Sequence, residues 1–574
     1  MSSFRARTRR LYLLLLSIVA LIPLLPYAYL PLTDAPNHLL AAFIIVHYRD
    51  PHFRFPTYFT YDLTPRSNIL GHYLMILLLR AGLSPQNTLR VFAGIIVLTT
   101  LGGLYLLLRV TRGPDHAAFW LPLGIPLAYT WFFHQGFLNF SFSVGLGLLT
   151  LALGLGLRIW GGNVGAGRPL RTWAMPYLFL TGALYATYLA HALGLALVLT
   201  AVGGLLLAQS LPLLRKKHIR HLTLLLARGL LPFLLLALLI YLTGKLSPNA
   251  GGESQAFLSP PFIVWVPLSK KVAELRYGLL NYTPWREQLI LLPLALLYLV
   301  YWLRTWRRPR PWHLPPLLAL AAYFLLPMGF WVPFFIYERF WLFALLLGIV
   351  VLPLPERTHR VRYWGTRGLL LLMPLLFLLN LTNDYRIANG YLRDYDRVLE
   401  ELPPRAVAFP FTYHHQGRIS PARHFWAYAM MRQDVFIPMV FAETYHPVQY
   451  RPSVPRPYPL HYEDGFFAEH ARNRATLWVR VDDPLMQERT LPKLPRHGYV
   501  QTGRIGPYAI YRLSTWPPPV PPEARPHIRP EIVRTYTHLL LFGYPPAHLV
   551  EEIERSYHLA VQWGLAKLYR RGEP

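Results

Sequence analysis

The sequence predicts an α-helical membrane protein that crosses the bilayer about eleven times and ends in a small α/β domain outside the membrane. Three observations predict this fold class. The chain of 574 residues is 53% hydrophobic, with a mean hydropathy of +0.28. Apolar stretches of about 20 residues, each long enough to cross a hydrocarbon core, recur as far as residue 382. Residues 383–574 instead carry charge and many prolines and contain no spanning stretch.

The net charge of +29 is distributed in a pattern typical of membrane proteins. Basic residues cluster between the apolar stretches, as they do in cytoplasmic loops. This placement predicts a multi-pass membrane protein with its N-terminus inside and its C-terminal domain outside, and it argues against nucleic acid as a partner. The clusters are Arg5, Arg7, Arg9 and Arg10; Arg109 and Arg112; Arg158, Arg168 and Arg171; Arg215, Lys216, Lys217, Arg220 and Arg228; Arg304, Arg307, Arg308 and Arg310; and Arg357, Arg360, Arg362 and Arg367.

These clusters also set the number of spans. The clusters at Arg109 and Arg158 must both lie inside, so residues 115–157 are expected to cross twice, with an outer turn at "FFHQGFLN". Residues 174–211 are expected to cross twice in the same way and to turn near His191. The other spans are expected near 11–31, 87–109, 222–243, 288–305, 313–331, 340–354 and 367–382. No clean cleavage site follows the first span, at residues 11–31, and this favours an uncleaved signal anchor.

A large first outer loop is expected at about residues 32–88. Its stretch "ILGHYLMILLL", residues 69–79, is only half a span long and predicts an amphipathic or re-entrant helix at the outer surface. The stretch "AAFIIVHYRDPHF" also has a helical pattern. If residues 69–79 crossed the membrane, every later basic cluster would lie on the wrong side.

This loop opens with "LTDAPNHLLAA", residues 32–42. Thr33 or Asp34 is expected to cap a helix that has Pro36 in its first turn. Asp34 and His38 then lie four residues apart on one helix face. A carboxylate held at the membrane surface can act as a general base toward an acceptor hydroxyl, and this role is compatible with capping.

The domain prediction has three parts: a transmembrane domain at 1–382, an extracytoplasmic α/β domain at 383–525, and a helical tail at 526–574. "RDYDRVLEELPPRAVAFPF" is typical of a helix, a turn and a strand, and "TLWVRV" and "PYAIYRL" have strand composition. "EIVRTYTHLLLF" and "AHLVEEIERSYHLAVQWGLAKLYRR" are expected to form amphipathic helices in the tail.

The chain resembles the GT-C class of polytopic membrane glycosyltransferases, and it is similar to the bacterial mannosyltransferase and aminoarabinose-transferase group. Several features carry the resemblance over about residues 5–382. Asp34 in "TDAPNH" opens a long first outer loop, and Arg90 lies at the start of the next span. "GFLNFSFSVGLGLLTLAL" and "YLAHALG" are similar to stretches in bacterial members, "YERF" opens a late span, and a soluble outer domain ends the chain.

The resemblance implies a mechanism and a set of partners. Asp34 maps onto the catalytic aspartate of the class, which deprotonates the acceptor for an inverting attack on the anomeric carbon of a polyprenyl-phosphate sugar. The acceptor class stays open between a glycan, a lipid and a protein, and membrane lipids surround the enzyme. The lipid-phosphate leaving group requires cations or polar groups at the outer surface. The candidate substrate-binding residues are His38, Arg339, Glu338, His191, Arg90, Lys270, Lys271, Arg276, His134 and Gln135.

Each candidate also has a structural interpretation. Arg339 is equally well explained by a pair with Glu338 at a span boundary, although it is the only basic residue in a short outer loop. The basic residues of "VPLSKKVAELRYGLLNYTPWRE" suit a surface helix that contacts lipid headgroups. His191 and Arg90 suit structural packing. The "HQGFLN" stretch, with Asn139, suits a polar turn with a capping amide.

No cofactor is certain from the sequence. Many GT-C members carry a second acidic residue in the outer loop that here contains "HQGFLN", and its absence means that a divalent metal is not supported. Asp50 and Asp62 are better explained by turns and caps. Histidines occur in "HHQGRISPARHFWAY" and "FAETYHPVQYRPSVPRPYPLHYEDGF", but their spacing matches no recognised zinc site.

Other function classes are excluded or kept as rivals. The chain has no cysteine, which excludes disulfides, thiolate zinc sites and cysteine nucleophiles. The absence of Gly-x-Ser-x-Gly, phosphate-cradling glycine and HExxH motifs disfavours a hydrolase or an NTPase. A transporter or translocator of lipid-linked sugars and a non-catalytic envelope assembly protein remain alternatives. Transporters usually carry ionisable groups in the middle of the membrane, whereas the polar residues here concentrate at the outer ends of spans.

Overall fold

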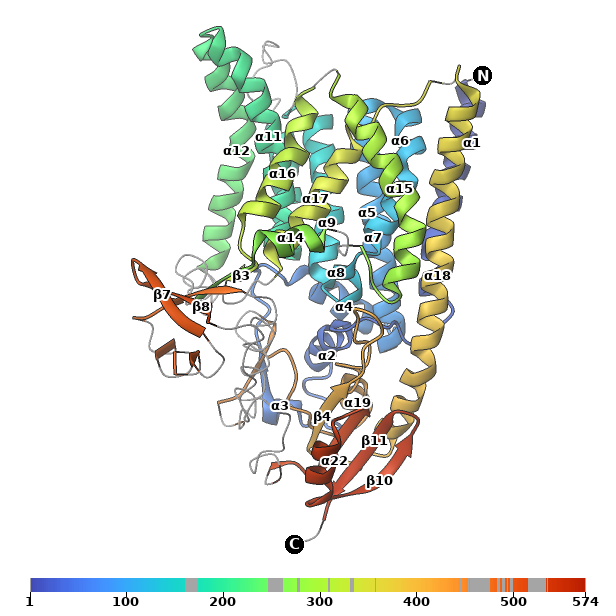
Figure 1. Ribbon diagram of the computed structural model, residues 1–574, viewed down its shortest axis with the longest axis vertical. Helices are drawn as coiled ribbons and strands as arrows, with labels where there is room; N and C mark the ends of the chain where they lie inside the picture. The colour runs from blue at the N-terminus through green and yellow to red at the C-terminus, as the bar shows by residue number, and fades with distance from the viewer. Residues whose placement is uncertain are drawn as a thin grey trace.

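The computed structural model has a helical bundle at one end, where the N-terminus lies, and a domain rich in strands at the other, where the C-terminus lies (Figure 1). It describes residues 2–160, 174–245, 262–275, 279–307, 310–330, 335–356, 358–442, 446–452, 454, 475–482, 486–487, 491–492, 494–495, 499–514, 533 and 535–572.

The helices of the bundle overlap the predicted spans. They are α1 (Ser2–Leu21), α5 (Pro85–Arg112), α9 (Leu138–Gly156), α10 (Ala174–Ala190), α11 (Ala192–Arg215), α12 (Ile219–Gly244), α15 (Pro284–Thr305), α16 (Leu314–Leu325), α17 (Ile336–Ile349) and α18 (Arg360–Glu400). Helix α1, however, ends at Leu21, ten residues before the predicted end of the first span. Within the described part of the chain, six helices are long and apolar enough to cross a membrane: α5, α9, α11, α12, α15 and α18. The polytopic membrane fold is therefore confirmed, whereas the number of eleven spans stays a prediction.

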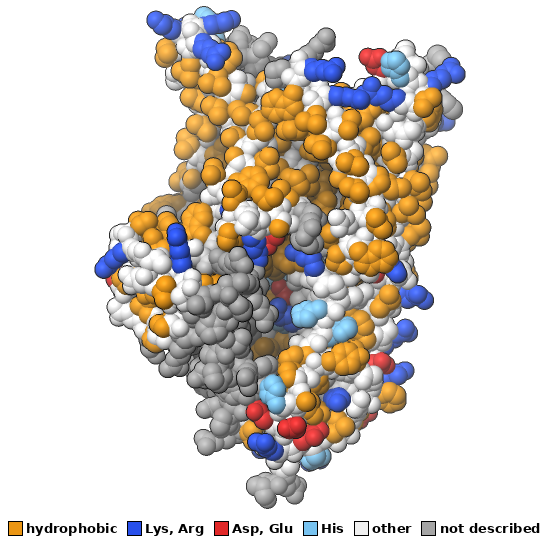
Figure 2. All heavy atoms as spheres, viewed as in Figure 1, with side chains coloured by type: hydrophobic (Ala, Val, Ile, Leu, Met, Phe, Trp, Pro, Cys, Tyr) orange, Lys and Arg blue, Asp and Glu red, His pale blue; other side chains and the backbone are white. Residues whose placement is uncertain are grey.

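The surface of the bundle agrees with a membrane environment. Hydrophobic side chains cover it, and Lys and Arg side chains gather along the rim at the N-terminal end (Figure 2). Many leucines of the spanning helices are exposed, among them Leu234 at 65% and Leu289 at 64%. Lipid tails would cover such residues in a bilayer.

One predicted span is not a continuous helix. Residues 114–134 form four short pieces: α6 (Pro114–Trp120), η2 (Leu121–Leu123), α7 (Gly124–Ala128) and α8 (Trp131–His134). Pro122 and Pro126 lie in this stretch, and proline removes a backbone donor and interrupts a regular helix. The stretch is almost entirely buried, so neighbouring helices enclose its irregular backbone.

The loop at residues 32–88, called the first outer loop after its predicted location, lies between the bundle and the strand-rich domain, which is called the outer domain for the same reason (Figure 1). It contains α2 (Ala35–Val46), α3 (Phe55–Tyr58), β1 (Phe59–Tyr61) and α4 (Leu70–Arg80). The helix predicted at residues 69–79 is α4, which has 11 residues and is too short to span. Every residue of α2 from 35 to 45 is buried, because α4 packs on one side and α19 (Ala427–Arg432) of the outer domain packs on another.

The outer domain contributes strands to three sheets in its described part. The first has strand order β10-β11-β9-β4, formed by β4 (Ala408–Tyr413), β9 (His538–Gly543), β10 (Tyr557–Trp563) and β11 (Ala566–Arg571). In this sheet β4 and β9 are parallel and the other pairs are antiparallel. The predicted strands in "RAVAFPF", "TLWVRV" and "PYAIYRL" are confirmed as β4, β6 and β8.

The second sheet joins the outer domain to loops of the bundle. Its order is β3-β2-β6-β8-β7, and β2 (Phe262–Trp265) and β3 (Gly329–Phe330) come from loops that follow α12 and α16. The other strands are β6 (Thr476–Arg480), β7 (Tyr499–Ile505) and β8 (Tyr508–Leu513). A two-stranded sheet of β1 with β5 (Val448–Tyr450) makes a similar connection to the first outer loop.

The predicted helical tail at 526–574 is wrong in most of its described part. Apart from residues 533 and 535, the described helical part of the tail is α22 (Ala547–Glu554), whereas β9, β10 and β11 are strands in one sheet with β4. Gly564, with a φ of 54°, makes the turn between β10 and β11. All six residues of β9 are buried, as expected for a central strand covered on both faces.

The predicted boundary at residue 382 lies inside a helix. Helix α18 has 41 residues and runs from the bundle into the outer domain, where it packs against β10 and β11 (Figure 1). A continuous helix transmits position better than a flexible linker, so α18 holds the outer domain against the bundle.

Candidate functional site

Asp34 is at the N-cap position of α2, as the sequence predicts. Its backbone is held by the "HQG" turn: the Asp34 amide donates to the Gln135 carbonyl at 2.9 Å, and the Thr33 amide donates to the His134 carbonyl at 3.0 Å. Gly136 has a φ of 82°, and a Cβ there would lie 2.5 Å from the amide nitrogen of Ala35. The turn therefore needs glycine to approach the start of α2.

The Asp34 carboxylate does not accept a capping hydrogen bond from α2. Its Oδ1 lies 3.3 Å from Nε2 of His424, and its side chain keeps 16% of its surface exposed. Nδ1 of His424 lies 3.3 Å from Nδ2 of Asn37, which also donates to the Met439 carbonyl at 2.9 Å. Oδ1 of Asn37 accepts from the Phe441 amide at 2.9 Å, which fixes the orientation of this side-chain amide.

These contacts assign the protons of His424. The oriented Asn37 amide presents a donor to Nδ1, so Nδ1 accepts and Nε2–H points to Asp34. Burial is the main cause that lowers the pKa of His424, although Asp34 opposes it. A neutral imidazole that donates one hydrogen bond orients the carboxylate and leaves its other oxygen available.

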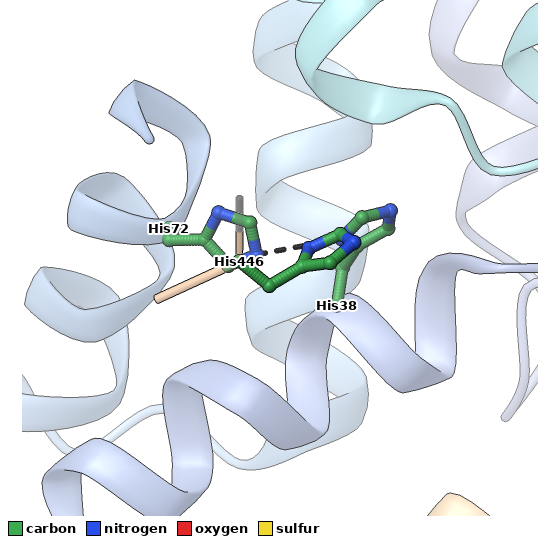
Figure 3. Close-up of side chains that lie close together, drawn as sticks. All are labelled: His38, His72 and His446. Carbon is green, nitrogen blue, oxygen red and sulfur yellow. Dashed lines mark hydrogen bonds between the residues drawn. The ribbon is translucent and has the colours of Figure 1, made fainter. Parts of the chain in front are cut away.

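His38, a candidate substrate-binding residue, lies against other histidines in the structure. It lies one turn further along α2, is buried, and its Nδ1 is 3.3 Å from Nε2 of His72 in α4. Ligand nitrogens of His38, His72 and His446 all lie within 4.8 Å of one another (Figure 3). The cluster is one that could hold a metal ion, and it is separate from the Asp34–His424 pair.

Arg339 is buried among aromatic rings. Its guanidinium carbon is 4.6 Å from the ring centre of Phe140, 5.6 Å from that of Phe137 and 5.7 Å from that of Phe132. Nε and Nη1 have no hydrogen-bond partner among the described residues. A buried guanidinium with open donors is costly, and an anion would satisfy it.

His191 lies beside Arg339, as both rest on the same aromatic ring. The His191 ring centre is 5.7 Å from that of Phe140. Nδ1 of His191 accepts from the Leu193 amide at 3.1 Å and so caps α11. This capping confirms the structural interpretation of His191.

Glu338 faces a small pocket at the outer end of the bundle. Trp131, Phe132, Glu274, Tyr323, Glu338, Trp341 and Arg418 line it. The molecular surface is hollowed between the bundle and the outer domain, and acidic and basic side chains lie in this hollow (Figure 2). Residues 131–137 connect the pocket to Asp34, because Trp131 and Phe132 line the pocket and Gln135 holds the Asp34 amide.

His134 and Gln135 contribute mainly through their backbone. The His134 ring is fully buried, with Nδ1 3.0 Å from the Thr130 carbonyl and Nε2 3.0 Å from the Tyr385 hydroxyl. The Gln135 side chain donates to the Arg418 carbonyl at 3.1 Å. The predicted sugar contacts of His134 are therefore wrong, because its ring has no exposed surface.

Two of the predicted cations, Arg90 and Lys271, donate to backbone carbonyls. Arg90 donates to the Leu24 and Tyr27 carbonyls at 3.1 and 2.6 Å, at the end of the first helical segment. Lys271 is buried and donates to the Phe324 and Leu326 carbonyls at 2.9 and 2.6 Å, at the C-terminus of α16. These contacts make Arg90 and Lys271 structural cations.

Two further predicted cations differ from these. Lys270 forms an ion pair with Glu274, a residue of the pocket, at 3.3 Å. Both residues lie on α14 (Leu268–Glu274). Arg276 lies outside the described residues.

The turn roles expected for Asp50 and Asp62 are confirmed. Asp50 accepts from the His52 amide at 3.0 Å. Asp62 accepts from the Thr64 amide at 2.8 Å and pairs with Arg66 at 2.8 Å.

Sequence reasoning missed the partners that the outer domain supplies. His424 and Arg418 both lie in "HHQGRISPARHFWAY", and His446 lies in "FAETYHPVQY". His424 is 390 residues away from Asp34 in the chain, so no local spacing connects them. The one available signal was the density of histidine and arginine in these two stretches.

Comparisons with known proteins give structural neighbours alone. No family model matches the chain, and no curated protein sequence matches it. Among solved structures, ArnT from Cupriavidus metallidurans in the apo state is 12% identical, with a TM-score of 0.44 over 89% of this chain and 98% of that one. The oligosaccharyltransferase of Archaeoglobus fulgidus in the apo form is 12% identical, with a TM-score of 0.45 over 100% of this chain and 89% of that one. Both neighbours are polytopic glycosyltransferases of the GT-C class.

Proposed function

We propose that the protein is an inverting glycosyltransferase that takes a sugar from a polyprenyl-phosphate donor at the outer face of a bacterial cytoplasmic membrane. Asp34 is the general base. The observation that carries this proposal is the state of its carboxylate, which starts a helix without capping it, is oriented by His424 and keeps part of its surface exposed. A carboxylate used only as a cap would be turned toward the free amides of α2.

The chemistry of the reaction uses this carboxylate as a proton acceptor. The acceptor hydroxyl gives its proton to Asp34 while its oxygen attacks the anomeric carbon from the face opposite the phosphate. The bond between the anomeric carbon and the phosphate oxygen breaks, and the polyprenyl phosphate leaves with the bonding electrons. The new glycosidic bond therefore has the opposite anomeric configuration to the donor.

The leaving phosphate needs positive charge, and Arg339 suits this role. Its Nε and Nη1 lack hydrogen-bond partners among the described residues, and aromatic rings surround it. A phosphate oxygen would complete a charge-assisted hydrogen bond that is strong in such a dry environment. Arg418, in the pocket beside Glu338, is a second cation for the donor, whereas Glu338 and Glu274 suit sugar hydroxyls.

The outer location is supported by charge distribution. Lys and Arg side chains gather at the N-terminal rim of the bundle, and Asp34 lies in the loop at the opposite end (Figures 1 and 2). The positive-inside rule then favours a cytoplasmic N-terminus and an extracytoplasmic site. A reporter fused after residue 574 is expected to be active on the extracytoplasmic side.

The test uses the full chain, purified and reconstituted in liposomes. The liposomes contain undecaprenyl-phosphate donors with radiolabelled hexoses or pentoses, and glycan, lipid and peptide acceptors are added in separate reactions. The expected result is donor-dependent label in one acceptor class, with inversion shown by NMR of the product. Asp34→Asn is expected to lower the rate by about 10²–10⁴-fold, the usual contribution of a general base.

Asp50→Asn is the matched control, since it removes a carboxylate from a turn of the same loop. Size-exclusion profiles and circular dichroism of both variants should match those of the wild type. A wild-type rate in folded Asp34→Asn would contradict the proposal. Movement of labelled lipid between leaflets without a new glycosidic bond would support a translocator instead.

A further inference from the structure

We infer that His38, His72 and His446 form a binding site for a divalent transition metal of the zinc type, which joins the first outer loop to the outer domain. This site is distinct from Asp34 and does not depend on the proposed glycosyl transfer. His38 comes from α2, His72 from α4, and His446 from the segment just before β5 (Figure 3).

The geometry of the three rings suits a metal. One ligand nitrogen of each histidine lies within 4.8 Å of the others, and all three residues are buried. Nδ1 of His38 and Nε2 of His72 are 3.3 Å apart. Two nitrogens bound to one tetrahedral zinc at about 2.0–2.1 Å lie about 3.3–3.4 Å apart, so this pair already has the required separation. Three protein ligands leave the fourth position for a water molecule or another small ligand.

The surroundings of His72 set the nitrogen that faces the cluster. Its Nδ1 lies 3.2 Å from the Asn68 carbonyl, which accepts a hydrogen bond from Nδ1–H and leaves the Nε2 lone pair toward His38. The Asn139 amide nitrogen lies 3.4 Å from the same Nδ1 and donates to the Asn68 carbonyl at 2.9 Å. A carbonyl that orients the outer nitrogen of a ligand histidine is the usual arrangement around protein-bound zinc.

The nearby charges do not oppose a cation strongly. Arg66 is a positive group beside His72 and His446, and it donates to the His446 carbonyl at 2.9 Å. Its charge is paired with Asp62 at 2.8 Å. The competing interpretation is a plain hydrogen bond between the neutral rings of His38 and His72 inside an aromatic cluster, in which Phe441 stacks on His446 at 5.3 Å.

A bound metal would strengthen a contact that the fold already makes. β1 pairs with β5 beside the cluster, and the Asp62 amide donates to the Pro447 carbonyl at 2.8 Å. Residues 38 and 446 are far apart in the chain, so a metal that links them closes a long loop and stabilises the docked state. Because His38 is on α2, the metal would also fix the helix that begins at Asp34.

The test measures metal directly. The full chain is purified in detergent with a Strep tag, because a polyhistidine tag would bind metal itself, and without chelators. Elemental analysis is expected to give about one zinc per chain, and cobalt added after chelation is expected to give the visible absorption of a tetrahedral site. His72→Gln and His446→Gln are each expected to lose at least 90% of the zinc.

His47→Gln is the matched control, because His47 is a half-exposed histidine of the same loop that pairs with Asp50. His446→Asp separates metal binding from a loss of aromatic stacking. Aspartate is also a metal ligand but cannot stack on a ring, so this variant is expected to retain cobalt binding with lower affinity. Wild-type protein that stays free of zinc and gives no cobalt spectrum at saturation would overturn the inference. Zinc content unchanged in folded His72→Gln and His446→Gln would overturn it too.

Discussion

Two polar residues of α2, Asp34 and His38, lie four residues apart and have different surroundings. Asp34 is partly exposed and has one histidine partner, His424, whereas His38 is buried and faces two other histidines. In both cases the outer domain supplies a histidine, His424 to one and His446 to the other. In the two proposals, one helix turn therefore serves a site for substrate and a separate metal site that joins the domains.

The difference follows from the direction of each side chain. Asp34 begins the helix at the "HQG" turn, on the side of the pocket that Glu338 and Arg418 line. His38 faces α4, whose Gly71 lets Asn139 approach, because a Cβ there would lie 2.0 Å from the Asn139 side-chain oxygen. Asp34 and His38, which are one helical turn apart, therefore have different chemical environments.

The largest expected effect separates the two positions. Asp34→Asn should lower glycosyl transfer by about 10²–10⁴-fold and leave the zinc content unchanged. His38→Gln should remove the zinc and alter transfer less than Asp34→Asn does. Rates and elemental analysis on the same preparations check this. Loss of zinc in Asp34→Asn would show that the two positions form one site.

Arg339→Gln is expected to have the next largest effect. It removes the charge proposed for the leaving phosphate and should lower kcat/KM for the donor by about 10²–10³-fold. Arg90→Gln serves as the comparison variant. Arg90 donates to backbone carbonyls, so its loss should lower kcat/KM for the donor less than the loss of Arg339 does. Donor saturation curves for both variants, with thermal melting as the fold control, test the difference. Equal losses of kcat/KM in the two variants would contradict the proposed role of Arg339 at the leaving phosphate.

His424→Gln should have a moderate effect, since His424 orients Asp34 and does not touch the reacting atoms in the proposal. We expect a decrease of about 10–100-fold in kcat with little change in KM for the donor. His424→Asn, which is shorter, should lose more than His424→Gln does. If KM changes and kcat does not, His424 binds the donor instead.

Gly136→Ala tests the backbone support of Asp34 and should cost about 1–3 kcal/mol of stability, because φ is positive and the Cβ has no room. Thermal unfolding in detergent measures the loss. Gly82→Ala is the comparison, since Gly82 has a φ of 87° but no atom within 4 Å of a Cβ. If Gly136→Ala loses no more stability than Gly82→Ala does, the turn does not lie in tight contact with the start of α2.

The smallest effect is expected for Asp50→Asn. Asp50 accepts from the His52 amide and pairs with His47 at the surface. Transfer should stay within about twofold of the wild type, as for most exposed positions away from a site. A large loss of transfer activity would indicate that the general base lies in this part of the loop and not at Asp34.

The sequence by itself determined the features that depend on short-range patterns. Length and apolarity located the spanning helices and kept α4 out of the set, because crossing a bilayer requires about 20 apolar residues. Local capping chemistry placed Asp34 at the N-cap of α2, since proline and a short polar residue favour a helix start. Strand composition located β4, β6 and β8.

Tertiary structure alone decided the partners and the tail. The segments at 538–543 and 557–571 have apolar patterns that suit a helix as well, and pairing with β4 makes them strands because the sheet satisfies their backbone groups. His424, His446 and Arg418 reach α2 and the pocket only through the docking of a domain hundreds of residues away. Contacts over such distances in the chain leave no periodic pattern in the sequence. Local residues therefore determine where α2 begins, whereas distant residues determine the chemical surroundings of Asp34.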